Sequence, residues 1–198
     1  YLARLFICAM ISEIPFDMLW RRAAFDFSVQ NVCFTLFLGG LSCVLYEEIR
    51  KTGGRLSRFA ALAAAAVPVA LAGVLHTDYG SFGAGLLFLL FLSGGNKPWA
   101  ALSLLAFDAA LCASRNATLT GFFGDIQHFC LLALPLILTA SGRRGIARKT
   151  GKSADASPLK PRADAAKSFI ARYYFYVFYP LHMALLALIR WALRAGVI

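Results

Sequence analysis

Residues 1–20 read "YLARLFICAMISEIPFDMLW", an apolar segment with two carboxylates and a proline in its second half. Glu13 and Asp17 are four residues apart, so a helix places both side chains on one face. Pro15 lies between them and removes one backbone hydrogen bond. An ionisable side chain inside a membrane helix costs about 2.5–3.5 kcal/mol on insertion scales, and such residues mark functional sites by default.

The composition of the chain indicates an integral membrane protein. Of its 198 residues, 60% are hydrophobic and only 15% are charged, a balance that soluble domains do not show. The net charge of +10 comes from short basic stretches between apolar runs, a pattern of membrane topology and not of nucleic-acid binding. No signal peptide is recognisable, and because residue 1 is Tyr we expect the natural N-terminus to lie upstream.

Seven apolar segments approach the length of about 20 residues that a helix needs to cross a bilayer. They predict an all-α fold, a polytopic integral membrane helix bundle that forms a single transmembrane domain over residues 1–198. The small side chains of "ALAAAAVPVALAG" suit close contact between helices in such a bundle. The expected spans are 1–19, 28–49, 57–75, 79–94, 98–114, 122–141 and 168–190.

Loop charges predict the orientation of the bundle. Thirteen Lys and Arg side chains fall in the loops after the second, fourth and sixth spans, against five in the alternate loops and the C-terminal tail. The basic side is expected to be cytoplasmic. Its longest loop, 143–167, is polar and rich in Lys, Ala and Ser, which predicts a flexible basic loop.

The remaining polar residues gather on the side opposite the basic loops. Only Asp108 departs from this pattern, because it lies about ten residues into the fifth span and so near the middle of the membrane. The outward-facing polar residues predicted in this way are Glu13, Asp17, Gln30, Asn31, the segment 76–80, Asp125, Gln127 and His128.

Each of these residues has a functional and a structural interpretation. Glu13 and Asp17 form a carboxylate pair suited to positioning or deprotonating a nucleophile; alternatively, the helix ends at Pro15 and Asp17 pairs with Arg21 or Arg22. Asp78 and Tyr79 contribute to the same layer or simply cap the next helix. His128, next to Gln127, is an acid–base group or a satisfied interfacial residue.

The last span, "ARYYFYVFYPLHMALLALIRW", contains a histidine well inside its apolar run. His182 shares a helix face with Tyr179, three residues earlier, and Pro180 opens the helix locally. A buried neutral histidine acts as base, acid or acyl carrier, or it is hydrogen-bonded and structural. The five cysteines lie in apolar runs without the Cys and His spacing of a zinc site, so we expect them to pack and expect no metal.

Several motifs along the whole chain resemble the TraX family, membrane proteins linked to N-terminal acetylation of conjugative pilin. The resemblance implies a membrane-embedded acetyltransferase of the bacterial inner membrane that takes acetyl from cytoplasmic acetyl-CoA and acylates a pilin or fimbrial subunit on the periplasmic side. The motifs are "YLARL…ISEIPFD", "QNVCFTLFLG", "DYGSFG", "LLALPLIL" followed by "SGRRG", and "FYVFYPLHM".

Within that resemblance, the catalytic candidates are His182, Glu13, Asp78 and His128. The acceptor-binding candidates are Asp17, Gln30, Asn31, Tyr79, Gln127 and Tyr179. Family members usually carry a further N-terminal helix with an Asp-His pair, so part of the catalytic apparatus is expected before residue 1, and the 146–167 stretch is longer than the family's usual link. Two other functions remain open: acyl transfer to a glycan or small amine, and a non-catalytic transporter or assembly factor.

Overall fold

The regular elements of the described residues are all helices, with no strand among them, which confirms the predicted all-α class. The computed structural model describes residues 1–198 apart from 22–24, 27, 116–125, 140–161 and 196–198, and the side chains of 55, 126, 127, 136 and 162–172 are also outside this description. The helices are α1 (Leu2–Trp20), α2 (Val32–Arg50), α3 (Arg55–Val74), α4 (Gly80–Leu92), α5 (Lys97–Arg115), the 3₁₀ helix η1 (Ile126–Leu132), α7 (Ala133–Thr139) and α8 (Arg162–Arg194).

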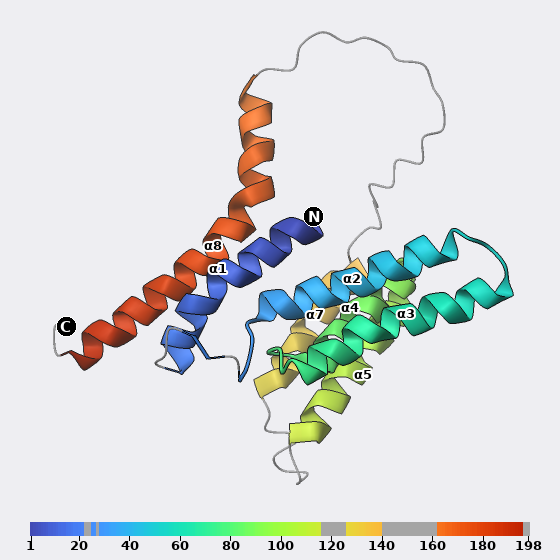
Figure 1. The fold of residues 1–198 in the computed structure, drawn as a ribbon, viewed down its shortest axis with the longest axis horizontal. Helices are drawn as coiled ribbons and strands as arrows, with labels where there is room; N and C mark the ends of the chain where they lie inside the picture. The colour runs from blue at the N-terminus through green and yellow to red at the C-terminus, as the bar shows by residue number, and fades with distance from the viewer. Residues whose placement is uncertain (22–24, 27, 116–125, 140–161, 196–198) are drawn as a thin grey trace.

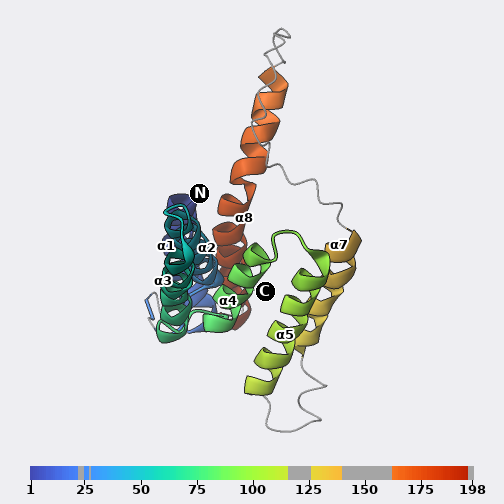
Figure 2. The ribbon, with the colours of Figure 1, turned by 90° about the vertical axis from the view of Figure 1, so that its right-hand side faces the viewer.

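Helix α2 is the centre of the bundle. It packs against α1, α3 and α4, while α8 packs along α1 and α5 joins through α4 (Figure 1). Helices α5 and α7 lie side by side on the far side of α4 (Figure 2). The protein therefore has a central α2–α3–α4 group with the α1–α8 pair on one side and the α5–α7 pair on the other.

Small residues allow the central helices to approach closely. Ala61, Ala65 and Ala72 of α3 are completely buried, in agreement with the predicted contact role of its alanine-rich sequence. A Cβ on Gly39 of α2 would lie 2.6 Å from a methyl carbon of Leu87 on α4. A larger side chain than that of glycine at position 39 would therefore push α2 and α4 apart.

Two arginines hold α1 and α8 together, one at each end of the pair. The Arg4 guanidinium of α1 lies 5.6 Å from the ring centre of Tyr173 on α8, a cation–π distance. At the other end, Arg190 of α8 donates a hydrogen bond to the backbone carbonyl of Leu19. The two helices run parallel and form one unit, because the start of α1 contacts the first half of α8 and its end contacts the last turns of α8.

Large apolar side chains cover the outer surface of the helices. Leu56, Phe59, Val74 and Leu181 are among many that are more than 60% exposed, and apolar surface on this scale marks contact with a membrane. Three described helices are long and apolar enough to span a bilayer, namely Val32–Arg50, Leu56–Val74 and Tyr173–Arg194. The bundle is that of a membrane protein, although the seven predicted spans are not confirmed.

The structure differs from the predicted elements in three places. Of the sixth predicted span, 122–141, the described residues 126–139 form a 3₁₀ helix followed by the short α7. Pro135 cannot donate an α-helical hydrogen bond, and it lies in the first turn of α7. Helix α1 continues through Pro15 to Trp20, so the alternative that it ends at Pro15 is wrong. Helix α8 already begins at Arg162, inside the predicted loop 143–167, of which 143–161 is outside the described residues.

The described turns alternate between the two ends of the bundle. In Figure 2 the α2–α3 and α4–α5 turns lie at the upper end, and the α3–α4 turn lies at the lower end. The upper turns and their flanking residues carry Arg50, Lys51, Arg55, Arg58 and Lys97. This alternation agrees with the charge-based orientation.

We expect the two ends to be on opposite sides of the membrane. Alkaline phosphatase fused after Gly53 should be inactive and a fluorescent protein fused there should be bright, because that turn is basic and expected to be cytoplasmic. The same reporters fused after Leu75 should give the reverse result. Identical behaviour of the two fusion points would contradict the orientation.

Candidate functional site

A buried carboxylate joins α1 to the start of α2. Glu13 is 8% exposed, and its Oε2 accepts hydrogen bonds from the backbone N–H of Asn31, at 3.3 Å, and from the Asn31 side-chain amide. The same amide donates to the Ala9 carbonyl at 2.9 Å, while Asn31 Oδ1 accepts from the Cys33 N–H at 2.9 Å. Asn31 is thus the N-cap of α2 and also the partner of Glu13.

Asp17, one helical turn after Glu13, is completely buried. Its Oδ2 accepts from the backbone N–H of Asp26 at 2.7 Å. Two carboxylate oxygens in this region, Glu13 Oε1 and Asp17 Oδ1, are buried and have no hydrogen-bond partner among the described residues. An unsatisfied buried acceptor costs about 1–3 kcal/mol, more for a charged group, so such atoms need an explanation.

The α3–α4 turn is fixed to the residue before Asn31. Gln30 donates its N–H to the His76 carbonyl at 3.2 Å and accepts from the Asp78 N–H at 2.9 Å. Between these two residues, the Thr77 hydroxyl accepts from the Thr35 hydroxyl at 3.0 Å. These bonds bring the predicted segment 76–80 beside the Glu13–Asn31 pair.

Tyr179 of α8 connects this region to His182. Its ring packs against the buried apolar clusters that include Ala9 and Phe16, on either side of Glu13 along α1. The His182 ring lies 5.3 Å from the Tyr179 ring, measured between centres, and is half-buried. His182 Nδ1 donates to its own helix at the Phe178 carbonyl, 3.1 Å away.

A pocket of about 400 Å³ opens beside these groups. Its walls are Phe16, Trp20, Arg21, Val29 and Asp78. The Asp78 side chain is exposed at this pocket, yet the surrounding protein displaces enough water to raise the pKa of its carboxyl, against the opposing effect of Arg115. A larger groove of about 930 Å³ between α1 and α8 has an apolar lining and adds no chemistry to this site.

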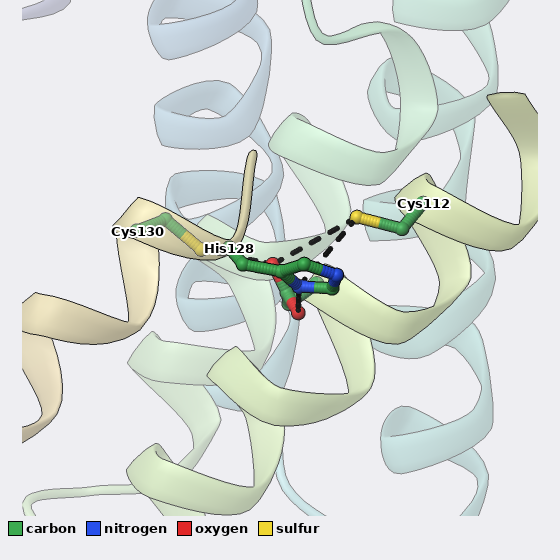
Figure 3. Close-up of polar contacts among 4 residues, drawn as sticks. Cys112, His128 and Cys130 are labelled. Atoms are coloured by element: carbon green, nitrogen blue, oxygen red, sulfur yellow. Dashed lines mark hydrogen bonds and ion pairs between the residues drawn. The ribbon is translucent and has the colours of Figure 1, made fainter. Parts of the chain in front are cut away.

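A second group of reactive side chains lies between α5 and η1 (Figure 3). His128 Nδ1 is 2.7 Å from Asp108 Oδ2 and 3.9 Å from the Cys112 sulfur. The Cys130 sulfur lies 3.4 Å from Asp108 Oδ1. Asp108 and Cys112 are buried, and together with His128 they have ligand atoms within 4.8 Å of one another, close enough to hold a metal ion.

The structure therefore divides the predicted site residues between two places. His128 belongs to the α5–η1 group, and Tyr79 lies at the N-cap of α4 without a side-chain capping bond, its ring 6.4 Å from that of Phe107 on α5. The Gln127 side chain and Asp125 are outside the description. Around the start of α2 lie Glu13, Asp17, Gln30, Asn31, Asp78, Tyr179 and, through Tyr179, His182.

Sequence reasoning missed the groups that support this region. Thr35 and Thr77 bond across 42 positions of sequence, and the Cys8 and Cys33 sulfurs lie 3.9 Å apart. Asp26, which bonds to Asp17, has its own pKa lowered by hydrogen bonds from Ser28. Thr35, Cys8 and Cys33 lie inside apolar runs and Asp26 lies in a loop, so no periodicity or spacing marked them.

Replacing Asn31 with Ala is expected to destabilise the fold by about 2–4 kcal/mol, because the helix cap contributes about 1 kcal/mol and the loss of its amide leaves a buried carboxylate short of donors, at about 1–3 kcal/mol. Asn96 is the matched control, since it also accepts from a helix N–H, that of Trp99, but is exposed. Asn96→Ala should cost about 1 kcal/mol or less. Unfolding by SDS in mixed micelles measures both, and equal losses would contradict the special position of Asn31.

Comparison with known proteins gives one match. The model of the TraX protein family matches residues 1–190 of the chain, whereas no curated protein and no solved structure matches it. The matched range contains every residue of both polar groups described above. The family supports a membrane protein related to conjugal transfer. The chain belongs to the TraX family.

Proposed function

We propose that this protein is an acetyltransferase that moves acetyl from cytoplasmic acetyl-CoA to the N-terminal amine of a pilin or fimbrial subunit on the periplasmic side of the bacterial inner membrane. The observation that carries the proposal is the pair of buried carboxylate oxygens, Glu13 Oε1 and Asp17 Oδ1, that lack partners among the described residues. Glu13 bonds to Asn31, next to the Gln30 that pairs with the α3–α4 turn, and this turn lies at the end of the bundle opposite the basic turns (Figure 2). Glu13 and Asp17 are thus candidates for binding an incoming cation.

An N-terminal amine fits this position chemically. In its charged form it offers three N–H donors, which the buried carboxylates and Asp78 at the neighbouring pocket accept. To react, the amine must lose a proton, and a carboxylate within hydrogen-bond reach serves as its base. The Glu13 carboxylate is held in place for this role by Asn31.

The opposite end of the bundle suits the acyl donor. The phosphates of acetyl-CoA are anionic, and the basic residues of the turns, such as Lys51 and Lys97, lie at that end. Positive charge at the mouth of a site raises the local concentration of an anionic substrate. The two substrates would in this way approach from opposite sides of the membrane.

In the proposed reaction the deprotonated amine attacks the thioester carbonyl, a C–N bond forms and the C–S bond breaks. The amine proton goes to the base, and CoA leaves as the thiol after taking up a proton. His182 is placed to carry protons, because donation from Nδ1 to the Phe178 carbonyl leaves the lone pair on Nε2. The Tyr179 ring contacts the His182 ring and packs against the apolar neighbours of Glu13 on α1.

Glu13→Gln and His182→Asn are expected to reduce acetyl transfer about 100-fold, the lower range for the loss of a general acid or base. The measurement uses the natural full-length protein in proteoliposomes, labelled acetyl-CoA and a peptide that copies a pilin N-terminus. Glu47→Gln and Asn96→Ala are the controls, because both side chains are exposed and lie by the turns at the opposite end of the bundle. Both controls should stay within about twofold of the wild type.

Full activity in Glu13→Gln and His182→Asn would return both residues to structural roles. Transfer to glycans or small amines in place of the peptide would favour the broader acyltransferase. Absence of transfer to every acceptor by the full-length protein would favour a transporter or assembly factor.

Pilins from a strain that lacks the gene should have free N-termini, while those from the parent strain should be acetylated. Mass spectrometry of intact pilin distinguishes the two forms. Complementation with the wild-type gene should restore the acetyl group, and complementation with Glu13→Gln should not. Acetylated pilin in the deletion strain would exclude pilin as the acceptor.

A further inference from the structure

The α5–η1 group, defined as Asp108, Cys112, His128 and Cys130, has no part in the proposed acetyl transfer. Its geometry points to a zinc site in which Asp108, Cys112 and His128 are the ligands. Asp108 and Cys112 lie on α5, and His128 lies on η1. Their side chains come together in Figure 3. A bound ion would join the start of η1 to the last turns of α5.

The donor set suits zinc. Thiolate, imidazole and carboxylate are the three zinc ligands of proteins, with bonds of about 2.0–2.3 Å, so that two ligands of a tetrahedral ion lie about 3.3–3.7 Å apart. Cys112 Sγ is 3.9 Å from His128 Nδ1 and 4.0 Å from an Asp108 oxygen. The third pair, His128 and Asp108, is a hydrogen bond of 2.7 Å that would open by about 0.6 Å as Nδ1 turns from donor to ligand.

The arrangement argues against a catalytic Cys–His–Asp triad. In such a triad the carboxylate holds one ring nitrogen and the nucleophile contacts the other. Here the Asp108 carboxylate and the Cys112 sulfur both approach Nδ1 of His128. With both groups at Nδ1, a proton cannot pass from Cys112 through the ring to Asp108. Three ligand atoms close to one point are, in contrast, what a bound metal ion requires.

Burial and access are also those of a metal site. Asp108 is 4% exposed and Cys112 is completely buried, and charged groups at such positions are stabilised by pairing or by metal coordination. The His128 side chain is 25% exposed, which gives an ion a path to the site. Binding would release the Cys112 thiol proton to solvent.

Cys130 supports the ligands from outside the set of three. Its thiol donates to Asp108 Oδ1, the oxygen that does not bond to His128. Hydrogen bonds to a ligating carboxylate fix its orientation, and their removal typically weakens metal affinity about 10–100-fold. Cys130→Ser is therefore expected to keep the stoichiometry and to lower the affinity by less than that range, because a hydroxyl also donates.

The test measures metal on the purified full-length protein in detergent micelles. We expect one zinc ion per chain after equilibration with zinc and gel filtration, and a thiolate-to-cobalt charge-transfer band when Co²⁺ replaces it. Cys112→Ser and Asp108→Asn should lose at least about 10-fold in affinity, by the magnitudes known for altered metal shells. Cys43→Ser is the control, because Cys43 is also a free, partly buried cysteine but lies on α2, and it should bind as the wild type does.

A second measurement needs no variant. Because Cys112 is completely buried, the wild-type protein is titrated with SDS in mixed micelles, and zinc should raise the SDS fraction at which Cys112 is alkylated, as read by mass spectrometry. A chelator should remove this protection, while the alkylation of Cys43 should depend less on zinc. Wild-type protein that takes up no zinc, or zinc binding that Cys112→Ser leaves unchanged, would overturn the proposal. Acetyl transfer does not enter either measurement, so failure of the zinc site and failure of the proposed function are distinguishable.

Discussion

The structure depends on how one carboxylate is accommodated inside an apolar bundle. Glu13 is removed from water, and a charge in that position is tolerated only when donors replace the lost hydration. Asn31 supplies two of them, one from its backbone and one from its side chain. Because Asn31 also caps α2 and bonds to Ala9, the position of α1 and the starting residue of α2 are determined together. The next constraint, the pairing of Gln30 with the α3–α4 turn, is directly adjacent in sequence.

This arrangement explains why the two polar groups are separate. The first lies where α1, the start of α2 and the α3–α4 turn meet, with α8 covering it through Tyr179. The second lies between α5 and η1, which reach the central helices through α4 alone among the described contacts. Helix α4 lies between the two groups, and Ser81 is the only polar side chain in its sequence from 80 to 92. Polar residues along α4 therefore do not connect the two groups.

The sequence was sufficient for the class of fold and for part of the site. Apolar run lengths placed five of the helices within a few residues, and alternation of the basic loops placed Glu13, Asn31 and Asp78 at one end, where the structure brings them together. The position of a residue along a helix, however, does not tell which neighbouring helix its side chain faces. Asp108 and His128 were recognised as unusual, yet only the packing of η1 on α5 brings them into contact, and no spacing pattern predicts it. The 3₁₀ conformation of η1 was missed for a similar reason, because hydropathy does not distinguish it from an α-helix.

The two arginines that fasten α8 to α1 have a consequence for motion. Arg4 lies over the Tyr173 ring at one end of the pair, and Arg190 bonds to Leu19 at the other. The two helices are therefore held together at both ends. Glu13 and His182 lie one on each helix of this pair, so the contacts between α1 and α8 determine their mutual spacing. Asn31 in turn holds Glu13 to the start of α2, so a loss of either arginine contact would shift His182 relative to a carboxylate that stays in place.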